Sequence, residues 1–141
     1  MRIYLACTVR GDRGAIAGLG ALVDCLERAG HTILTKHLLD DGVDSAEAAL
    51  SACEVYERDI AWLESCDLLI AEASGSSYGV GFEVGYVLAR SDRTTQRVLL
   101  LYRADRVNQI SRFIPGNTHP RCTVVTYDNP AELVGRVSAL M

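Results

Sequence analysis

The sequence predicts an α/β fold of the Rossmann-like type, a three-layer sandwich with helices on both faces of a parallel sheet of about five strands. Short apolar runs alternate with helical patterns along the whole chain, and the apolar run within Asp67–Ala71 is typical of a strand buried on both faces. Polar or small-residue loops follow the strand runs. Such alternation favours parallel strands joined by right-handed crossovers. At 141 residues, we expect a single domain over 1–141.

The first third of the chain reads as strand, loop, helix and strand. Ile3–Cys7 is a short apolar run, and the polar loop Thr8–Gly14 follows it. Apolar positions within Leu19–Leu26 recur at helical spacing, and Gly30 is placed to end that helix. The β-rich run Thr32–Thr35 predicts the second strand.

The middle of the chain predicts one long helix, a buried strand and a further helix. Ser45 is the candidate cap of the long helix, which extends to Leu63. The buried strand at Asp67–Ala71 leads into the small-residue segment Ser74–Gly81, and a helix is expected from about Phe82 to Arg90.

The last third predicts two strands and a closing helix. The strands are expected at Val98–Tyr102 and Cys122–Tyr127. Asn129 is the expected cap of a helix over Pro130–Leu140, with proline at its first position. Asp105–Arg121 is the least regular stretch.

Composition narrows the class of partner. The formal net charge of -4 argues against polymeric DNA or RNA, although local donors can still hold one small anion. Five cysteines without a C-x-x-C pair suit neither a disulfide framework nor zinc, and the three histidines lack metal-ligand spacing. No run is long enough to cross a membrane, and no leader pattern opens the chain. We therefore expect a cytoplasmic protein with no metal.

Three loops are expected to converge on one crevice, because ligands bind at the carboxyl ends of parallel strands. They are Thr8–Gly14, the turn after His37, and Ser74–Gly81. The last of these joins small residues to a helix start, which suits a phosphate. A tight turn that needs glycine for its backbone alone explains the same residues.

Four side chains in or near these loops are candidates for chemistry. Glu83 is a carboxylate in an otherwise nonpolar run, although complementing the helix dipole would also explain it. Asp59 is a second carboxylate, or an ordinary surface charge among other charges. Arg10 lies in the loop after the first strand, where donors to an anion are expected, although it could be an ordinary surface charge. Tyr4 interrupts the apolar strand, and its hydroxyl, if buried, would need a hydrogen-bond partner.

Several segments resemble the 2'-deoxynucleoside 5'-phosphate N-hydrolases, within the nucleoside 2-deoxyribosyltransferase superfamily. The resemblance runs from the first strand to the last in the same order, and the glycine-flanked Glu83 is its most specific element. The segments that carry it are Tyr4–Gly11, Leu34–His37, Glu57–Leu63, Ala71–Ala73 and Ser77–Gly85.

The resemblance implies a role for each matching residue. Glu83 matches the family's nucleophile, Asp59 an aspartate beside the base and sugar, and Tyr4 a tyrosine that hydrogen-bonds near the nucleophile. Thr8 stands where a serine is usual, and Ser111 matches a serine given to the neighbouring subunit's phosphate site. The other expected substrate-binding residues are Arg10, Gly11, Ser77 and Gly79 for the phosphate, Val55 for the base, and His37.

The chain departs from the family pattern in two places. Asp12 replaces the second glycine of the family's R-G-G, and Asp105–Arg121 matches poorly. These departures affect phosphate recognition more than the chemistry.

The implied reaction is hydrolysis of the N-glycosidic bond of a (2'-deoxy)nucleoside 5'-monophosphate. It proceeds through a Glu83 glycosyl-enzyme, releases the free base, needs no cofactor and occurs in a homodimer. Asp59 either protonates the departing base or holds a sugar hydroxyl. Two alternatives stay open: a nucleoside deoxyribosyltransferase, and a nucleotide-binding module without turnover.

Overall fold

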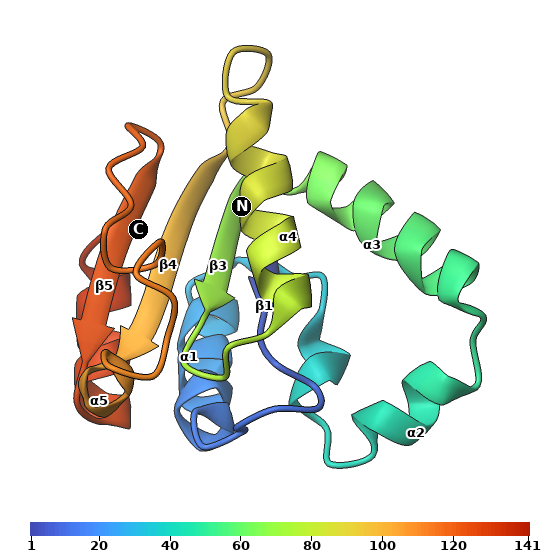
Figure 1. The fold of residues 1–141 in the computed structure, drawn as a ribbon, viewed down its shortest axis with the longest axis horizontal. Helices are drawn as coiled ribbons and strands as arrows, with labels where there is room; N and C mark the ends of the chain where they lie inside the picture. The colour runs from blue at the N-terminus through green and yellow to red at the C-terminus, as the bar shows by residue number, and fades with distance from the viewer.

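The computed structural model describes residues 1–141 and confirms the α/β fold, with five parallel strands in the order β2-β1-β3-β4-β5 (Figure 1). The strands are β1 (Arg2–Ala6), β2 (Thr32–Ile33), β3 (Leu68–Glu72), β4 (Arg97–Arg103) and β5 (Cys122–Tyr127). The helices are α1 (Ile16–Arg28), α2 (Val43–Ala48), α3 (Ala52–Ser65), α4 (Tyr78–Ala89) and α5 (Pro130–Ser138), with 3-10 turns η1 (Lys36–Leu39) and η2 (Ala104–Arg106). No helix is long and apolar enough to cross a membrane.

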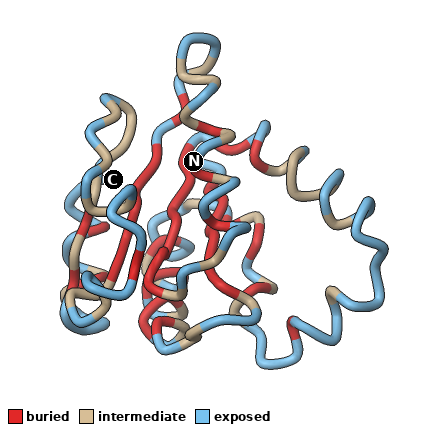
Figure 2. The backbone as a smooth tube through the Cα atoms, in the orientation of Figure 1, coloured by how far each residue is buried: buried red, intermediate tan, exposed pale blue.

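The core lies on both faces of the sheet, which is why all five residues of β3 are buried. One face packs against α1 and α5 through side chains such as Leu19 and Leu133. The other face packs against α4, with Val84, and against the end of α3, with Leu63. Buried residues are concentrated in the strands, while the residues of α2 and most of α3 are exposed or half-buried (Figure 2).

The strand order reverses between β1 and β3. The chain moves from β1 to β2 on one side and then returns to place β3 on the other side of β1. Connections leaving the carboxyl ends of β1 and β3 therefore diverge, and this divergence leaves the crevice in which α/β proteins bind ligands.

The expected long helix from Ser45 to Leu63 is wrong: the chain forms α2 and α3 instead. Ser51 caps α3, because its hydroxyl accepts a hydrogen bond from the Glu54 backbone N–H while the Glu54 carboxylate accepts one from the Ser51 backbone. This is a capping box, whose sequence signal is serine followed three residues later by glutamate. The break lets α2 turn away from the line of α3.

Helix α4 begins at Tyr78, four residues before the expected start, and Ser77 is its cap. Glu83 consequently lies in the second turn, where the helix dipole has largely faded. Complementing that dipole therefore does not explain the carboxylate. Helix α1 begins at Ile16, three residues before the expected run, and the remaining strand and helix bounds lie within two residues of expectation, including the Asn129 cap.

Candidate active site

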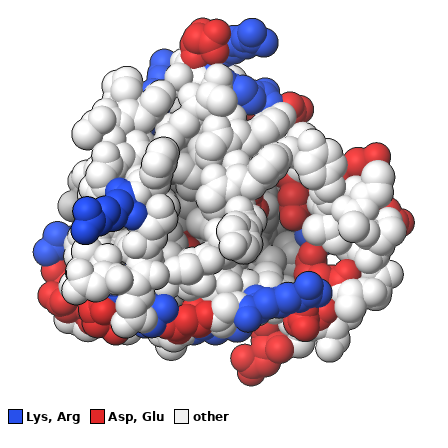
Figure 3. Space-filling model, viewed as in Figure 1, with Lys and Arg blue, Asp and Glu red and all other residues white.

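A cleft of about 530 Å³ opens at the carboxyl ends of β1 and β3, the point where the strand order reverses. The loops that follow these strands form one side, and α2 and α3 form the other. Figure 3 shows the surface hollowed between α4 and the α2–α3 segment, with acidic side chains along its edge. The expected site residues that line it are Tyr4, Thr8, Arg10, Gly11, Val55, Asp59, Ser77, Gly79 and Glu83.

Glu83 is held at the floor of the cleft by Tyr4. The Tyr4 hydroxyl donates a hydrogen bond of 2.6 Å to Oε1 of Glu83. Tyr4 is fully buried in the middle of β1, and its register opposite Leu69 of β3 fixes where the phenol points. A short bond from a neutral donor fixes one carboxylate oxygen and leaves the other free to react.

Burial sets the acidity of this pair. It raises the pKa of Glu83 to about 7, the Tyr4 hydrogen bond lowers that pKa, and the negative charge of Asp59 raises it. Burial, followed by the charge of Glu83, raises the pKa of Tyr4 far above its usual range, so the phenol stays a donor. At neutral pH Glu83 is poised between its acid and its carboxylate.

Asp59 faces the same cleft from α3. Burial raises the pKa of Asp59, whereas the hydrogen bond and positive charge of Arg58 lower it. The Arg58 guanidinium lies 2.9 Å from Oδ1 of Asp59. Glu83 has no basic partner of this kind, so the two carboxylates occupy electrostatically different surroundings.

The loops after β1 and β3 touch through glycines. A Cβ on Gly75 would lie 2.3 Å from Cγ2 of Thr8, and one on Gly11 would lie 2.7 Å from the Gly75 carbonyl oxygen. Thr8 is buried between them, and its hydroxyl accepts a 2.8 Å hydrogen bond from the Gly11 backbone N–H. Glycine is needed here for close approach of two backbones.

Donors gather where these loops meet. The start of α4, at Ser77 and Gly79, presents backbone N–H groups and the positive end of a helix dipole. Arg10 lies on the neighbouring loop, where its Nε is 2.8 Å from Oδ1 of Asp44. Both side chains are largely exposed, so Arg10 can exchange this partner for another anion.

Asp12, which the resemblance aligns with a glycine, ties the first loop to the end of β4. Its carboxylate accepts a 2.7 Å hydrogen bond from the Gly14 backbone and a 3.0 Å bond from Arg103. Arg106 lies 3.5 Å from the same carboxylate. The Asp12 carboxylate thus links the loop after β1 to Arg103 and Arg106, at and just after the end of β4.

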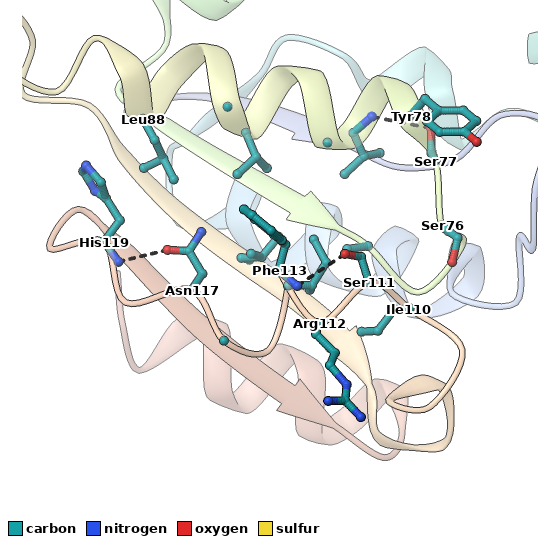
Figure 4. Close-up of a pocket in the computed structure, with 18 of the residues that line it drawn as sticks. Ser76, Ser77, Tyr78, Leu88, Ile110, Ser111, Arg112, Phe113, Asn117 and His119 are labelled. Atoms are coloured by element: carbon teal, nitrogen blue, oxygen red, sulfur yellow. Dashed lines mark hydrogen bonds between the residues drawn. The ribbon is translucent and has the colours of Figure 1, made fainter.

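Two expected residues lie outside the cleft. His37 does not line it; its ring packs at 5.7 Å from that of Trp62, behind Glu47. Ser111 borders a second hollow of about 1110 Å³ between α4 and the 105–121 stretch, together with Phe113 (Figure 4). No acidic side chain lines that hollow, so it offers no carboxylate nucleophile.

Sequence reasoning missed Glu47 and Asp44, which approach the cleft from α2. The prediction of one long helix hid Glu47, because the break before α3 is what turns α2 toward the cleft, and Asp44 was expected in the polar loop before that helix. The Ser51 and Glu54 pair was the signal that could have revealed the break. No group of His, Cys, Asp and Glu side chains is arranged to hold a metal ion.

Comparison with known proteins decides the family. The model of the nucleoside 2-deoxyribosyltransferase family matches residues 3–129. The chain belongs to this family. Within the family's matched region lie all the cleft-lining carboxylates and both loops.

Similar proteins cover most or all of the chain. A Thermofilum pendens protein named "Putative 2'-deoxynucleoside 5'-phosphate N-hydrolase 1" is 38% identical over 141 residues, covering 100% of this chain and 95% of that protein. A Danio rerio protein named 5-hydroxymethyl-dUMP N-hydrolase is 31% identical, with 82% of this chain and 78% of that protein covered. The solved Clostridium botulinum CMP N-glycosidase BcmB shares the fold at a TM-score of 0.73 and 20% identity, with both chains covered in full.

Proposed function

We propose that this protein hydrolyses the N-glycosidic bond of (2'-deoxy)nucleoside 5'-monophosphates, with Glu83 as the nucleophile. The observation that carries the proposal is the Tyr4-held Glu83 in a cleft shared with Asp59 and bordered by two donor-rich loops. The names of the relatives supply the substrate class, since they are nucleotide N-hydrolases.

The phosphate occupies the junction of the two loops. Arg10 and Gly11 approach it from one loop, and Ser77 and Gly79 at the start of α4 approach it from the other. Binding the phosphate away from the reacting carbon orients the sugar over Glu83, with Thr8 beneath the junction. Val55 of α3 packs on the base at the far end of the cleft.

The reaction proceeds in two displacements, as in retaining glycosidases. The ionised Glu83 attacks C1' of the sugar, the C1'–N bond breaks, and a glycosyl ester forms on the carboxylate. Asp59 either gives a proton to the departing base or holds a sugar hydroxyl. Water then attacks C1' and gives up a proton to Asp59 or to the released base, which restores the Glu83 carboxylate and releases the 5-phospho-sugar.

The test is release of free base. The protein is incubated with a panel of nucleoside monophosphates and matching nucleosides, and free base is measured by chromatography, with folded Glu83→Gln as the control. We expect release from at least one monophosphate and none from the variant. Tight nucleotide binding without base release by the wild-type protein would establish the non-catalytic alternative instead.

The family model matched is that of a transferase, and this favours a second candidate activity. A deoxyribosyltransferase would pass the sugar from Glu83 to another base instead of to water. Adding a second free base to the same assay separates the two. A new nucleoside or nucleotide in place of the 5-phospho-sugar would identify the transferase.

We propose in addition that the protein is a homodimer in which Ser111 completes the neighbouring phosphate site. Ser111 lies outside its own cleft, and the hollow it borders carries Tyr78 and Phe113, which are 98% and 89% exposed. Exposed aromatic side chains around an apolar hollow are typical of a protein interface. Sedimentation should give a dimer for the wild type and a monomer for Phe113→Asp; a monomeric wild type would contradict the proposal.

A further inference from the structure

Arg58 of α3 contacts two carboxylates and an aromatic ring. Its Nε donates a 2.9 Å hydrogen bond to Oδ1 of Asp59, and Nη2 lies 2.9 Å from the same oxygen. Toward Glu47 of α2, Nη1 lies 2.9 Å from Oε1 and Nη2 donates a 3.2 Å bond to Oε2. The guanidinium carbon stands 4.9 Å from the centre of the Trp62 ring. Two carboxylates fill the edge of the guanidinium plane while an aromatic ring covers its face.

This arrangement is not the ordinary pairing of charges along a helix. Consecutive helical residues such as Arg58 and Asp59 point in different directions, and side chains pair along a helix at spacings of three or four. Arg58 turns toward its neighbour because Glu47 of α2 holds the guanidinium from outside the helix, while Trp62, one turn along α3, covers its face. The contact with Asp59 is therefore imposed by the α2–α3 packing.

We propose that Arg58 is a positioning residue that fixes the direction of the Asp59 carboxylate and supplies its counter-charge, with Glu47 as the anchor of Arg58. The inference rests on the proposed function, because Asp59 acts only if the cleft is the reaction site. Arg58 itself does not line the cleft and reaches the substrate only through Asp59.

The charges that face Asp59 come from five elements. Arg58 lies on the same helix, Glu47 on α2, His37 on η1, Glu83 on α4 and the Tyr4 hydroxyl on β1. Nε2 of His37 is 3.3 Å from Oε1 of Glu47, behind the anchor and away from the cleft. Among these groups Arg58 alone is a permanent positive charge.

Replacing Arg58 and replacing Glu47 should shift the pKa of Asp59 in opposite directions. Removing Arg58 takes away the cation, so the pKa of Asp59 rises. Glu47→Gln keeps an oxygen that can accept from Arg58 and removes only a competing anion that raises the Asp59 pKa, so that pKa falls. General loss of structure does not give opposite signs.

The experiment titrates the Asp59 carboxyl in the free protein by carbon-13 NMR, with the signal assigned through Asp59→Asn, and measures kcat and KM on the substrate. For Arg58→Met we expect a midpoint about one pH unit higher and kcat at least about tenfold lower with little change in KM. Glu47→Gln should shift the midpoint downward. Arg58→Lys should recover part of kcat, because it restores the charge without the planar, two-sided contact.

The matched control is Arg90→Met. Arg90 also stacks on an aromatic ring, at 5.0 Å from the centre of Tyr86, and pairs with a carboxylate, but that partner, Glu64, does not line the cleft as Asp59 does. It should leave the Asp59 midpoint and kcat unchanged. An unshifted midpoint or an unchanged kcat in Arg58→Met, or shifts of the same sign in the two variants, would overturn the proposal. The NMR measurement needs no turnover, so it separates failure of this inference from failure of the proposed function.

Discussion

The Tyr4 hydroxyl and Oε1 of Glu83 are joined by a 2.6 Å hydrogen bond between residues 79 positions apart in the sequence. Through it, the first strand of the chain orients a carboxylate on α4 and lowers its pKa against the larger, opposite effect of burial. The pKa of Glu83 near 7 makes that carboxylate sensitive to pH in the physiological range.

The first prediction concerns the pH dependence of turnover. Because Glu83, the proposed nucleophile, must be ionised to attack, kcat/KM should rise with pH through about 7 and then level off. Tyr4→Phe removes the hydrogen bond that lowers the Glu83 pKa, so the rising limb should move upward by about one pH unit. The control is Tyr86→Phe, because Tyr86 lies on α4 with Glu83 but its hydroxyl donates to Glu64 instead. A limb at unchanged or lower pH in Tyr4→Phe would rule out this role.

The second prediction is that Glu83→Gln abolishes base release and stabilises the fold above neutral pH. The folded-state pKa of about 7 lies above the ordinary 4.5, so the protonated carboxyl contributes stability below pH 4.5 that is lost as pH rises through 7. Ionisation then costs up to about 3 kcal/mol at pH 8, and the glutamine avoids that cost. Urea unfolding at pH 4.5 and pH 8 should show the gain only at pH 8. An equal gain at both would point to a cause other than ionisation.

The third prediction separates phosphate binding from catalysis. Arg10→Ala should reduce kcat/KM on a monophosphate by roughly ten- to a hundredfold and barely change it on the nucleoside. Asp44→Asn frees Arg10 from its exposed partner and should raise efficiency on the monophosphate by up to about fivefold. Steady-state kinetics on both substrates test this. Equal changes on nucleotide and nucleoside would remove Arg10 from the phosphate site.

The fourth prediction tests the contact between the two loops. Gly75→Ala places a methyl group 2.3 Å from Thr8 and 3.0 Å from the Asp12 carbonyl, and should lower the free energy of unfolding by about 1–3 kcal/mol. The separated loops should also bind phosphate less well, so efficiency should fall more on the monophosphate than on the nucleoside. Gly20→Ala is the control, since nothing lies within 4 Å of its added methyl and alanine favours a helix. If Gly75→Ala matched Gly20→Ala in stability, the close approach would be unimportant.

Much of the fold could be predicted because the signals are local. The buried run of β3, the Asn129 cap and the strand at Cys122–Tyr127 each depend on a few neighbouring residues, and all three lie where expected. The same holds for the two loops at the carboxyl ends of β1 and β3, whose positions follow from parallel topology.

The site was predictable only in part. The resemblance pointed to Glu83, Asp59 and Tyr4, and the structure places all three in one cleft. The Arg58 contacts, by contrast, depend on where α2 lies relative to α3, and no periodicity in the sequence encodes that angle. His37 illustrates the same limit, because its neighbours come from packing and not from its own loop.

The two ends of the cleft are attached to the protein in different ways. The end that holds Glu83 is built on buried strands and their loops, whereas α2 and α3 each bury a single residue, Val43 and Leu63. The α2–α3 wall, where we propose that the base binds, can therefore change at little cost to the half that carries Tyr4 and Glu83. The segment spanning 40–56 is the natural unit for exchange among relatives, and a chimera that carries it from another family member should inherit that donor's choice of base while retaining this chain's nucleophile.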